Sequence, residues 1–223
     1  MTNYIGLKTE KAAEVAAAAL IAMTFLAIFA FGYAHNTVLE NYMNNTIHWQ
    51  LPLLEIGAWC IIVVLDALVA VALCRFFHTV DQSLAYWLGG LRLLYTLVLA
   101  CAVAVLGHAY SLIFISSDAS DRVLTQIAQF DRIWSIGLII FGLHLILVGR
   151  VAMKAAFFPK WLAYLIVIAG FCYAMVHGLH QLAPNFAMLA NQLEKILSLP
   201  MTAAEIGLAL WLWLKGRKIN SVN

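Results

Sequence analysis

Apolar residues gather in six stretches of this chain, and polar or charged residues separate the stretches. The stretches cover residues 11–34, 53–74, 84–110, 132–148, 160–177 and 198–214. Each approaches the roughly 20 residues that an α-helix needs to cross the hydrocarbon core of a bilayer. The pattern predicts an all-α fold, a polytopic transmembrane helix bundle of about six spans that forms a single domain over residues 1–223.

The composition excludes an ordinary soluble domain. Of the 223 residues, 64% are hydrophobic and 11% are charged, whereas globular chains are about 45–50% apolar and about 25% charged. The net charge is only +2 and the basic residues form no continuous run, so we expect the lipid bilayer as a partner and no nucleic acid. Residues 12–34 exceed the roughly 7–15 apolar residues of a signal peptide, so we expect a retained first helix.

Basic residues occur on alternate connections between the apolar stretches. One side carries Lys8, Lys11, Arg75, Arg150, Lys154, Lys160, Lys215, Arg217 and Lys218. The other side has only Arg122, Arg132 and Lys195. Because cytoplasmic loops collect Lys and Arg, we expect both termini in the cytoplasm. Trp49 and Trp134 then fall near the outer interface, as in an aromatic belt.

The two longer outer connections contain apolar residues at helical spacing. These residues are Val123, Leu124, Ile127 and Phe130 in one connection, and Phe186, Leu189, Leu193 and Ile196 in the other. The spacing is typical of short amphipathic helices, which we expect to lie on the outer surface or to cap the bundle. Pro200 fits the first turn of the last helix, where a missing N–H costs nothing.

Ionisable residues inside a bilayer cost about 2.5–3.5 kcal/mol on insertion scales, so they usually have a partner or a function. At about 1.5 Å per residue, Asp66 and Arg92 lie roughly 12–13 Å from the inner boundary. His144 falls at a similar depth, and Tyr95 lies one helical turn beyond Arg92. We expect these four residues to form an intramembrane polar cluster. The cluster is either a ligand or proton site or a structural ion pair that fixes helix register.

A second polar set lies toward the outer face. It comprises Glu55, Glu205, His108, His177 and His180, with His35 and His48 in the first outer loop. His177 and His180 are three residues apart, so they share a helical face. With Glu55 or Glu205 they could bind a divalent metal, or they are interfacial histidines with ordinary hydrogen bonds. A haem on His144 is disfavoured, because no second histidine lies at a matching depth.

Three signatures follow one another from the second apolar stretch to the end of the chain. The first signature runs from Leu65-Asp66-Ala67 through Cys74-Arg75-Phe76-Phe77 to Arg92-Leu93-Leu94-Tyr95. The second includes Phe141-Gly142-Leu143-His144, Pro159-Lys160-Trp161-Leu162 and Ala169-Gly170-Phe171-Cys172-Tyr173. The third is Glu205-Ile206-Gly207-Leu208, followed by Lys215-Gly216. In this order they resemble the bacterial membrane family catalogued as domain of unknown function 4386. The resemblance implies a helix bundle in a bacterial inner membrane and places Asp66, Arg92, His144 and Glu205 in the shared pattern. It implies no established activity.

The sequence contains no motif that dictates a reaction, and three functions fit it. The cluster around Asp66 can bind or transport a small molecule or an ion. Alternatively, the chain is a structural or regulatory subunit, with a membrane-protein partner or a second copy of itself. A membrane enzyme with metal or haem at the outer histidines is less favoured. The sequence therefore favours a protein that is not an enzyme, and it leaves the cofactor open.

Overall fold

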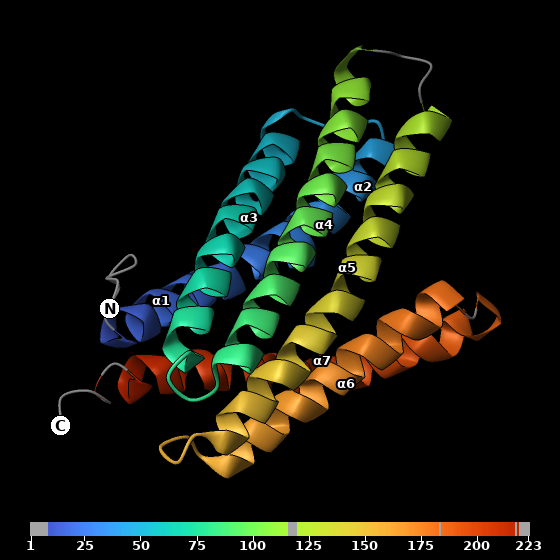
Figure 1. The fold of residues 1–223 in the computed structure, drawn as a ribbon. Helices are drawn as coiled ribbons and strands as arrows, with labels where there is room; N and C mark the ends of the chain where they lie inside the picture. The colour runs from blue at the N-terminus through green and yellow to red at the C-terminus, as the bar shows by residue number, and fades with distance from the viewer. Residues whose placement is uncertain (1–8, 116–119, 183, 217, 219–223) are drawn as a thin grey trace.

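The computed structural model describes residues 9–115, 120–182, 184–216 and 218, and every regular element in them is a helix (Figure 1). The elements are α1 (Thr9–Ala27), the π-helical segment η1 (Ile28–His35), α2 (Asn36–Met43), α3 (Gln50–Phe77), α4 (Gln82–Ile115), α5 (Ser120–Lys154), α6 (Lys160–Leu182), the 3₁₀ turn η2 (Pro184–Phe186) and α7 (Ala187–Leu214). The segments α1, η1 and α2 follow one another without a break and form one continuous helix.

Within the described residues, six helices are long and apolar enough to cross a membrane. They are Thr9–Met43, Gln50–Phe77, Gln82–Ile115, Asp121–Lys154, Lys160–Leu182 and Met188–Leu214. The prediction of an all-α bundle of about six spans is therefore confirmed. Lys8 and Arg217, which contribute to the predicted orientation, lie outside the described residues.

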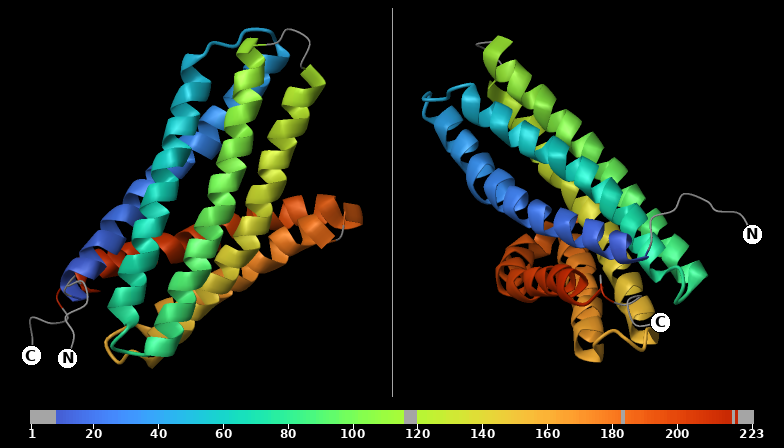
Figure 2. Two further views of the ribbon diagram at one scale, coloured as in Figure 1. Left: turned by 45° about the horizontal axis from the view of Figure 1, so that its top comes forward. Right: turned by 90° about the vertical axis from the view of Figure 1, so that its left-hand side faces the viewer.

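The six long helices form a closed ring. Each helix packs against the next along the chain, and α7 returns to pack against α1. The start of α1, the end of α7 and the connections 78–81 and 155–159 lie at one end of the molecule, the terminal end (Figures 1 and 2). Toward the opposite, distal end the α6–α7 hairpin diverges from the other helices (Figure 2).

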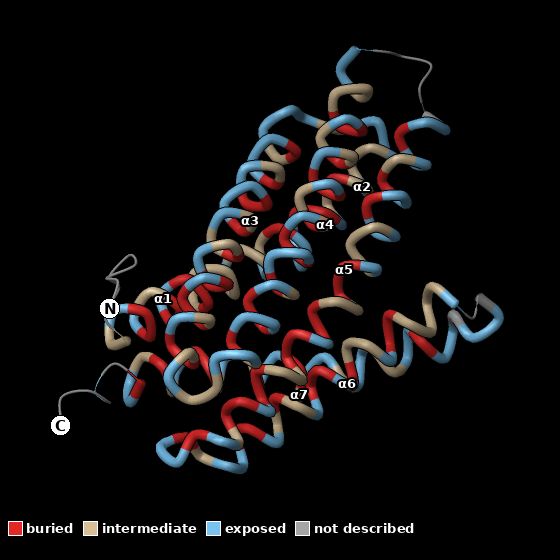
Figure 3. Tube along the Cα trace, in the orientation of Figure 1, coloured by how far each residue is buried: buried red, intermediate tan, exposed pale blue. Residues whose placement is uncertain are grey.

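Small residues allow the helices to approach one another closely. Helix α1 packs against α3 and α7, and its buried residues include Ala12, Ala13, Ala16 and Ala17. Where α5 crosses α6, a Cβ on Gly142 would lie only 2.6 Å from the carbonyl oxygen of Gly170. Lipid tails are as apolar as leucine, so membrane helices associate through such close packing. Figure 3 shows buried positions turned toward the ring interior and exposed ones turned outward.

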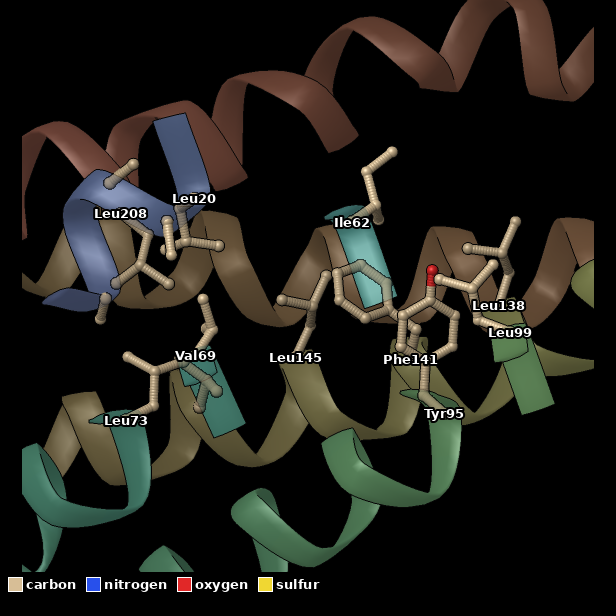
Figure 4. Close-up of a cluster of buried hydrophobic side chains, with 14 of the residues drawn as sticks. Leu20, Ile62, Val69, Leu73, Tyr95, Leu99, Leu138, Phe141, Leu145 and Leu208 are labelled. Carbon is tan, nitrogen blue, oxygen red and sulfur yellow. The ribbon is translucent and has the colours of Figure 1, made fainter. Parts of the chain in front are cut away.

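Two layers of apolar side chains fill the interior near the terminal end. The layer nearer the middle of the bundle is Leu20, Val69, Leu73, Leu145 and Leu208 (Figure 4). The layer nearer the terminal end contains the ring contacts of Phe76, Phe77, Phe158 and Trp211. Nearly all of this surface is buried. The two layers, called here the terminal plug, place apolar side chains across the interior of the described bundle at this level.

At the terminal end, Asp81 connects the start of α4 to the end of α5. Its carboxylate accepts the backbone N–H of Leu84 at 3.0 Å, as the cap of a helix N-terminus does. It also accepts a hydrogen bond from the Lys154 ammonium at 2.6 Å. These hydrogen bonds hold the pKa of the Asp81 carboxyl below its usual value, because they stabilise the ionised form.

The prediction of separate amphipathic helices in the outer connections is wrong. Residues 123–130 belong to α5 and residues 187–196 to α7, and both helices continue into their membrane spans. No Gly or Pro interrupts residues 120–136, so nothing in that segment ends the helix before the span. Pro200 lies inside α7 and not in its first turn. Proline there leaves the carbonyl of Ile196 without its helical donor.

Candidate functional site

Asp66, Arg92 and His144 meet in the interior of the ring, as their matched depths predict. Arg92 donates from Nε and Nη2 to Asp66 Oδ1 at 2.8 and 2.5 Å, and its Nη1 lies 3.3 Å from His144 Nε2. All three residues are at most 1% exposed. A buried ion pair of this kind suits both a structural and a ligand-binding role, so the role itself stays a prediction.

The hydrogen bonds of His144 determine which ring nitrogen carries the proton. Nδ1 lies 2.8 Å from the carbonyl oxygen of Leu88, which can only accept, so Nδ1 is protonated. Nε2 then accepts from Arg92, which can only donate. Because both nitrogens are engaged, His144 could bind a haem iron only by losing one of these bonds.

A cavity of about 130 Å³, the central cavity, lies beside this ion pair, and all six long helices contribute to its wall. Its polar wall is formed by Asp66, Arg92, Tyr95, Tyr173 and Glu205. Its aromatic wall includes Trp59, Trp134 and Phe141. A water molecule occupies about 30 Å³ in the liquid, so the volume corresponds to about four water-sized groups. Three of the four predicted cluster residues, Asp66, Arg92 and Tyr95, thus line one cavity. The fourth, His144, contacts Arg92 but is not among the lining residues.

Glu205 belongs to the central cavity and not to the outer set in which we placed it. Its Oε1 accepts a hydrogen bond from the Tyr173 hydroxyl at 2.6 Å. The misplacement arose because α7 begins at Ala187 rather than near residue 198, so Glu205 lies deep in the helix. It is nine residues from the other end of α7, Leu214, which puts it at the level of Asp66.

Three buried side-chain atoms in the described residues lack a hydrogen-bond partner, and all three belong to residues that line the central cavity. They are the donors Trp59 Nε1 and Trp134 Nε1 and the acceptor Asp66 Oδ2. Thr96 also faces Asp66, but its hydroxyl donates to the Arg92 carbonyl at 2.8 Å. An unsatisfied buried polar group costs about 1–3 kcal/mol. Unmet hydrogen-bonding capacity is therefore concentrated in residues around the central cavity.

A larger cleft of about 660 Å³, the distal cleft, lies between the α6–α7 hairpin and the rest of the ring. Its polar lining includes His35, Asp131, His177, His180 and Glu194. Trp134 and Leu138 line both the distal cleft and the central cavity, so they form the wall between them. The terminal plug lies on the other side of the cavity. The cleft and the cavity thus lie toward the distal end, and buried apolar side chains fill the ring interior toward the terminal end.

His35 links two carboxylates beside the distal cleft. Its Nδ1 lies 2.9 Å from Oε1 of the fully buried Glu55, whose other oxygen, Oε2, accepts from the Tyr110 hydroxyl at 2.5 Å. Its Nε2 lies 3.6 Å from Asp131 Oδ1. The prediction that His35 lies in a loop is wrong, because the first helix continues to Met43. His35 ends the π-helical segment η1, and such segments are frequent at functional sites.

The outer histidines do not gather around one point. His177 and His180 share a face as predicted, with ring centres 6.1 Å apart. His177 Nδ1 lies 3.1 Å from Ser135 Oγ, and His180 Nε2 lies 3.1 Å from Glu194 Oε2. His108 is exposed. Among the residues that the structure describes, no group of three His, Cys, Asp or Glu side chains is arranged to hold a metal ion.

Sequence reasoning did not single out Trp59 and Tyr173 as site residues, and it placed Trp134 at the outer interface. Trp59 lies seven residues before Asp66, which is two helical turns on one face, so helical spacing could have found it. Tyr173 lies in the second signature described above. The position of Trp134 depends on the extension of α5, which the apolar pattern alone does not show.

The closed ring of apolar helices around a polar interior defines a multi-pass helical membrane protein. The chain belongs to the family described as domain of unknown function (DUF4386), which matches residues 15–216 and confirms the resemblance. The chain is also 26% identical over 171 residues to an uncharacterized protein of Archaeoglobus fulgidus, covering 73% of this chain and 83% of that protein. No solved structure shows a significant match.

Proposed function

We propose that this protein binds a small polar molecule in the central cavity and transports it across the membrane. Three of the residues that line one cavity, with walls from six helices, each have an unpartnered buried polar atom, and this coincidence carries the proposal. Secondary transporters place their substrates near the bilayer midplane, between helices. Intramembrane ionisable residues, here Asp66, Arg92 and Glu205, frequently mark substrate pathways.

The asymmetric interior supports transport over a static binding site. The distal cleft extends to Trp134 and Leu138, one layer of side chains from the central cavity. The terminal plug closes the opposite side. An interior that approaches one surface and is sealed from the other is what alternating access requires of one of its states.

We place the protein in a bacterial cytoplasmic membrane with its terminal end inside, on the positive-inside pattern. Arg75, Lys154 and Lys160 lie at or near the terminal end. A fluorescent protein fused after Asn223 is expected to fold in the cytoplasm and fluoresce, whereas alkaline phosphatase fused there is expected to be inactive. Active phosphatase at that position would reverse the orientation.

Thiol labelling tests whether the central cavity is reached by water. In a chain whose four native cysteines are replaced by alanine, Ser135→Cys places a thiol in the distal cleft and Thr24→Cys places one in the central cavity. Both are expected to react with a small charged reagent added from the distal side. The control Leu73→Cys lies in the terminal plug and is expected to stay unlabelled. An unreactive Thr24→Cys beside a reactive Ser135→Cys would contradict the proposal.

Native mass spectrometry of protein extracted gently from its own membranes tests for the ligand directly. A reproducible small added mass is expected. Asp66→Asn is expected to lower the fraction of protein that carries this mass, because a side-chain amide replaces the acceptor-only carboxylate that contains Asp66 Oδ2. A bare chain, or a chain that carries only a second protein, would contradict the proposal and favour a structural or regulatory subunit.

A further inference from the structure

The walls of the central cavity favour positive charge. They contain two carboxylates, of Asp66 and Glu205, and one guanidinium, of Arg92. Arg92 directs two hydrogen bonds to Asp66 and a third to His144, so its charge is already matched. None of the ion pairs formed within the described part of the chain includes Glu205. One carboxylate is therefore left without a cationic partner.

Aromatic rings surround these carboxylates. Trp59, Tyr95, Trp134, Phe141 and Tyr173 all line the same small cavity. Aromatic faces are electrostatically negative and attract cations within about 6 Å. Arg92 already uses one of them, because its guanidinium carbon lies 5.3 Å from the ring centre of Phe141. Aromatic faces beside a carboxylate are the usual protein environment for an organic ammonium ion.

The two unpartnered indole N–H groups add a second requirement. Trp59 and Trp134 pack edge to face with ring centres 5.1 Å apart, and the indole N–H of each has no acceptor. The Tyr95 hydroxyl lies near Trp134 but not in hydrogen-bond geometry. A guest that satisfies these donors must carry an acceptor, and oxygen is the usual one.

We infer that the central cavity binds a small protonated amine that also carries a hydroxyl or ether oxygen. The ammonium group is held between Glu205, Asp66 Oδ2 and the aromatic faces, and the oxygen accepts from an indole N–H. The volume admits only a molecule of about four water-sized groups, which limits the ligand to a compact amino alcohol or a close analogue. This inference names the substrate class of the transport site and rests on the proposed function.

Isothermal titration of the full-length protein in detergent tests the inference with three probes of similar size and with acetate as an anionic control. Ethanolamine carries both features, propylamine lacks the oxygen, and ethylene glycol lacks the charge. Ethanolamine is expected to bind about tenfold more tightly than propylamine, as one satisfied buried donor implies. Ethylene glycol is expected to bind least. Equal binding of ethylene glycol and ethanolamine, or tighter binding of acetate, would overturn the inference.

Variants assign each preference to a residue. Glu205→Gln is expected to weaken ethanolamine binding about thirtyfold or more, the effect of truncating a buried charge partner. Trp134→Phe keeps the ring and removes the donor, so it is expected to reduce the preference for ethanolamine over propylamine. Glu194→Gln makes the same chemical change on α7 outside the central cavity and is expected to leave equilibrium binding unchanged. Thermal unfolding of each variant verifies that it is folded.

The outcomes separate the inference from the proposed function. If none of the probes binds while Thr24→Cys is labelled, the cavity is accessible but the ligand class is wrong. If a folded Glu205→Gln variant binds ethanolamine as tightly as the parent, Glu205 does not hold the ammonium group and the inference fails. If no probe binds and Thr24→Cys is unlabelled, both the inference and the proposed function fail.

Discussion

Removing one partner of the Asp66–Arg92 pair is expected to destabilise the bundle far more than removing both. In Asp66→Leu the guanidinium of Arg92, which is 1% exposed, loses its two hydrogen bonds to a carboxylate. Breaking a buried pair in this way costs about 3–5 kcal/mol, whereas replacing both members by apolar residues is often nearly neutral. Asp66→Leu with Arg92→Met is therefore expected to recover most of the loss, with a coupling energy of about 2–4 kcal/mol.

The assay is equilibrium unfolding in mixed micelles by titration with a denaturing detergent, followed by circular dichroism, for the four proteins of a double-mutant cycle. The matched control is the Asp81–Lys154 pair, where the lysine side chain is 57% exposed. Because water screens that pair, its two substitutions are expected to be additive. Additivity at Asp66 and Arg92, within the about 0.5 kcal/mol that independent sites show, would refute the pairing argument.

Three further predictions concern other parts of the bundle. Gly142→Ala is expected to cost about 1–3 kcal/mol in unfolding free energy, because its Cβ would meet backbone atoms of α6 that cannot move aside. Tyr110→Phe is expected to cost about 1–3 kcal/mol, since the buried Glu55 carboxylate loses a donor. Asp81→Asn is expected to reduce the loss of thermal stability below about pH 4. The pKa of the Asp81 carboxyl is lower in the folded protein than in the unfolded chain. Its contribution to stability is therefore present above the unfolded-state pKa and is lost as the pH falls through the folded-state pKa.

Matched control variants distinguish these specific effects on stability from the effect of any substitution. Gly178→Ala makes the same change on α6 where nothing lies within 4 Å, so it is expected to be neutral. Tyr33→Phe removes a hydroxyl from a ring that is 56% exposed and is expected to change little. Equal effects of Gly142→Ala and Gly178→Ala, or of the two tyrosine variants, would contradict the packing and hydrogen-bond arguments. An unchanged acid profile in Asp81→Asn would contradict the third.

The sequence predicts the spans well because burial in lipid demands an uninterrupted apolar run. It predicts helix ends poorly, because a helix that continues beyond the hydrocarbon core consists of polar residues and leaves no apolar run in the sequence. His35 shows the consequence: the apolar run ends before it, yet the helix continues to Met43 and buries the imidazole against Glu55. The distal half of the bundle, which contains the cleft, was therefore the part that sequence reasoning missed.

Counting residues from a helix end predicted the depth of a buried residue correctly where that helix end was itself predicted correctly. Asp66 and Arg92 lie on consecutive antiparallel helices joined by a short turn, so counting from that turn placed them together. Glu205 was counted from the distal end of α7, which was misplaced, and it was assigned to the wrong set. Counting from Leu214 gives nine residues, the same number that separates Asp66 from Arg75. Which helices are neighbours in the ring could not be read from one sequence, because lipid-facing and partner-facing positions are both apolar.

The order of the helices along the chain has a consequence for biogenesis. Asp66 and Arg92 lie on α3 and α4, so the most costly charges neutralise one another as soon as that hairpin enters the bilayer, and His144 joins them one helix later. Glu205 arrives later, on α7, the helix that completes the ring against α1. A nascent chain that stops before residue 187 therefore carries a neutral, insertable core but no enclosed pocket. The central cavity is therefore enclosed only after α7 has entered the bilayer, so chains that stop before α7 do not enclose it.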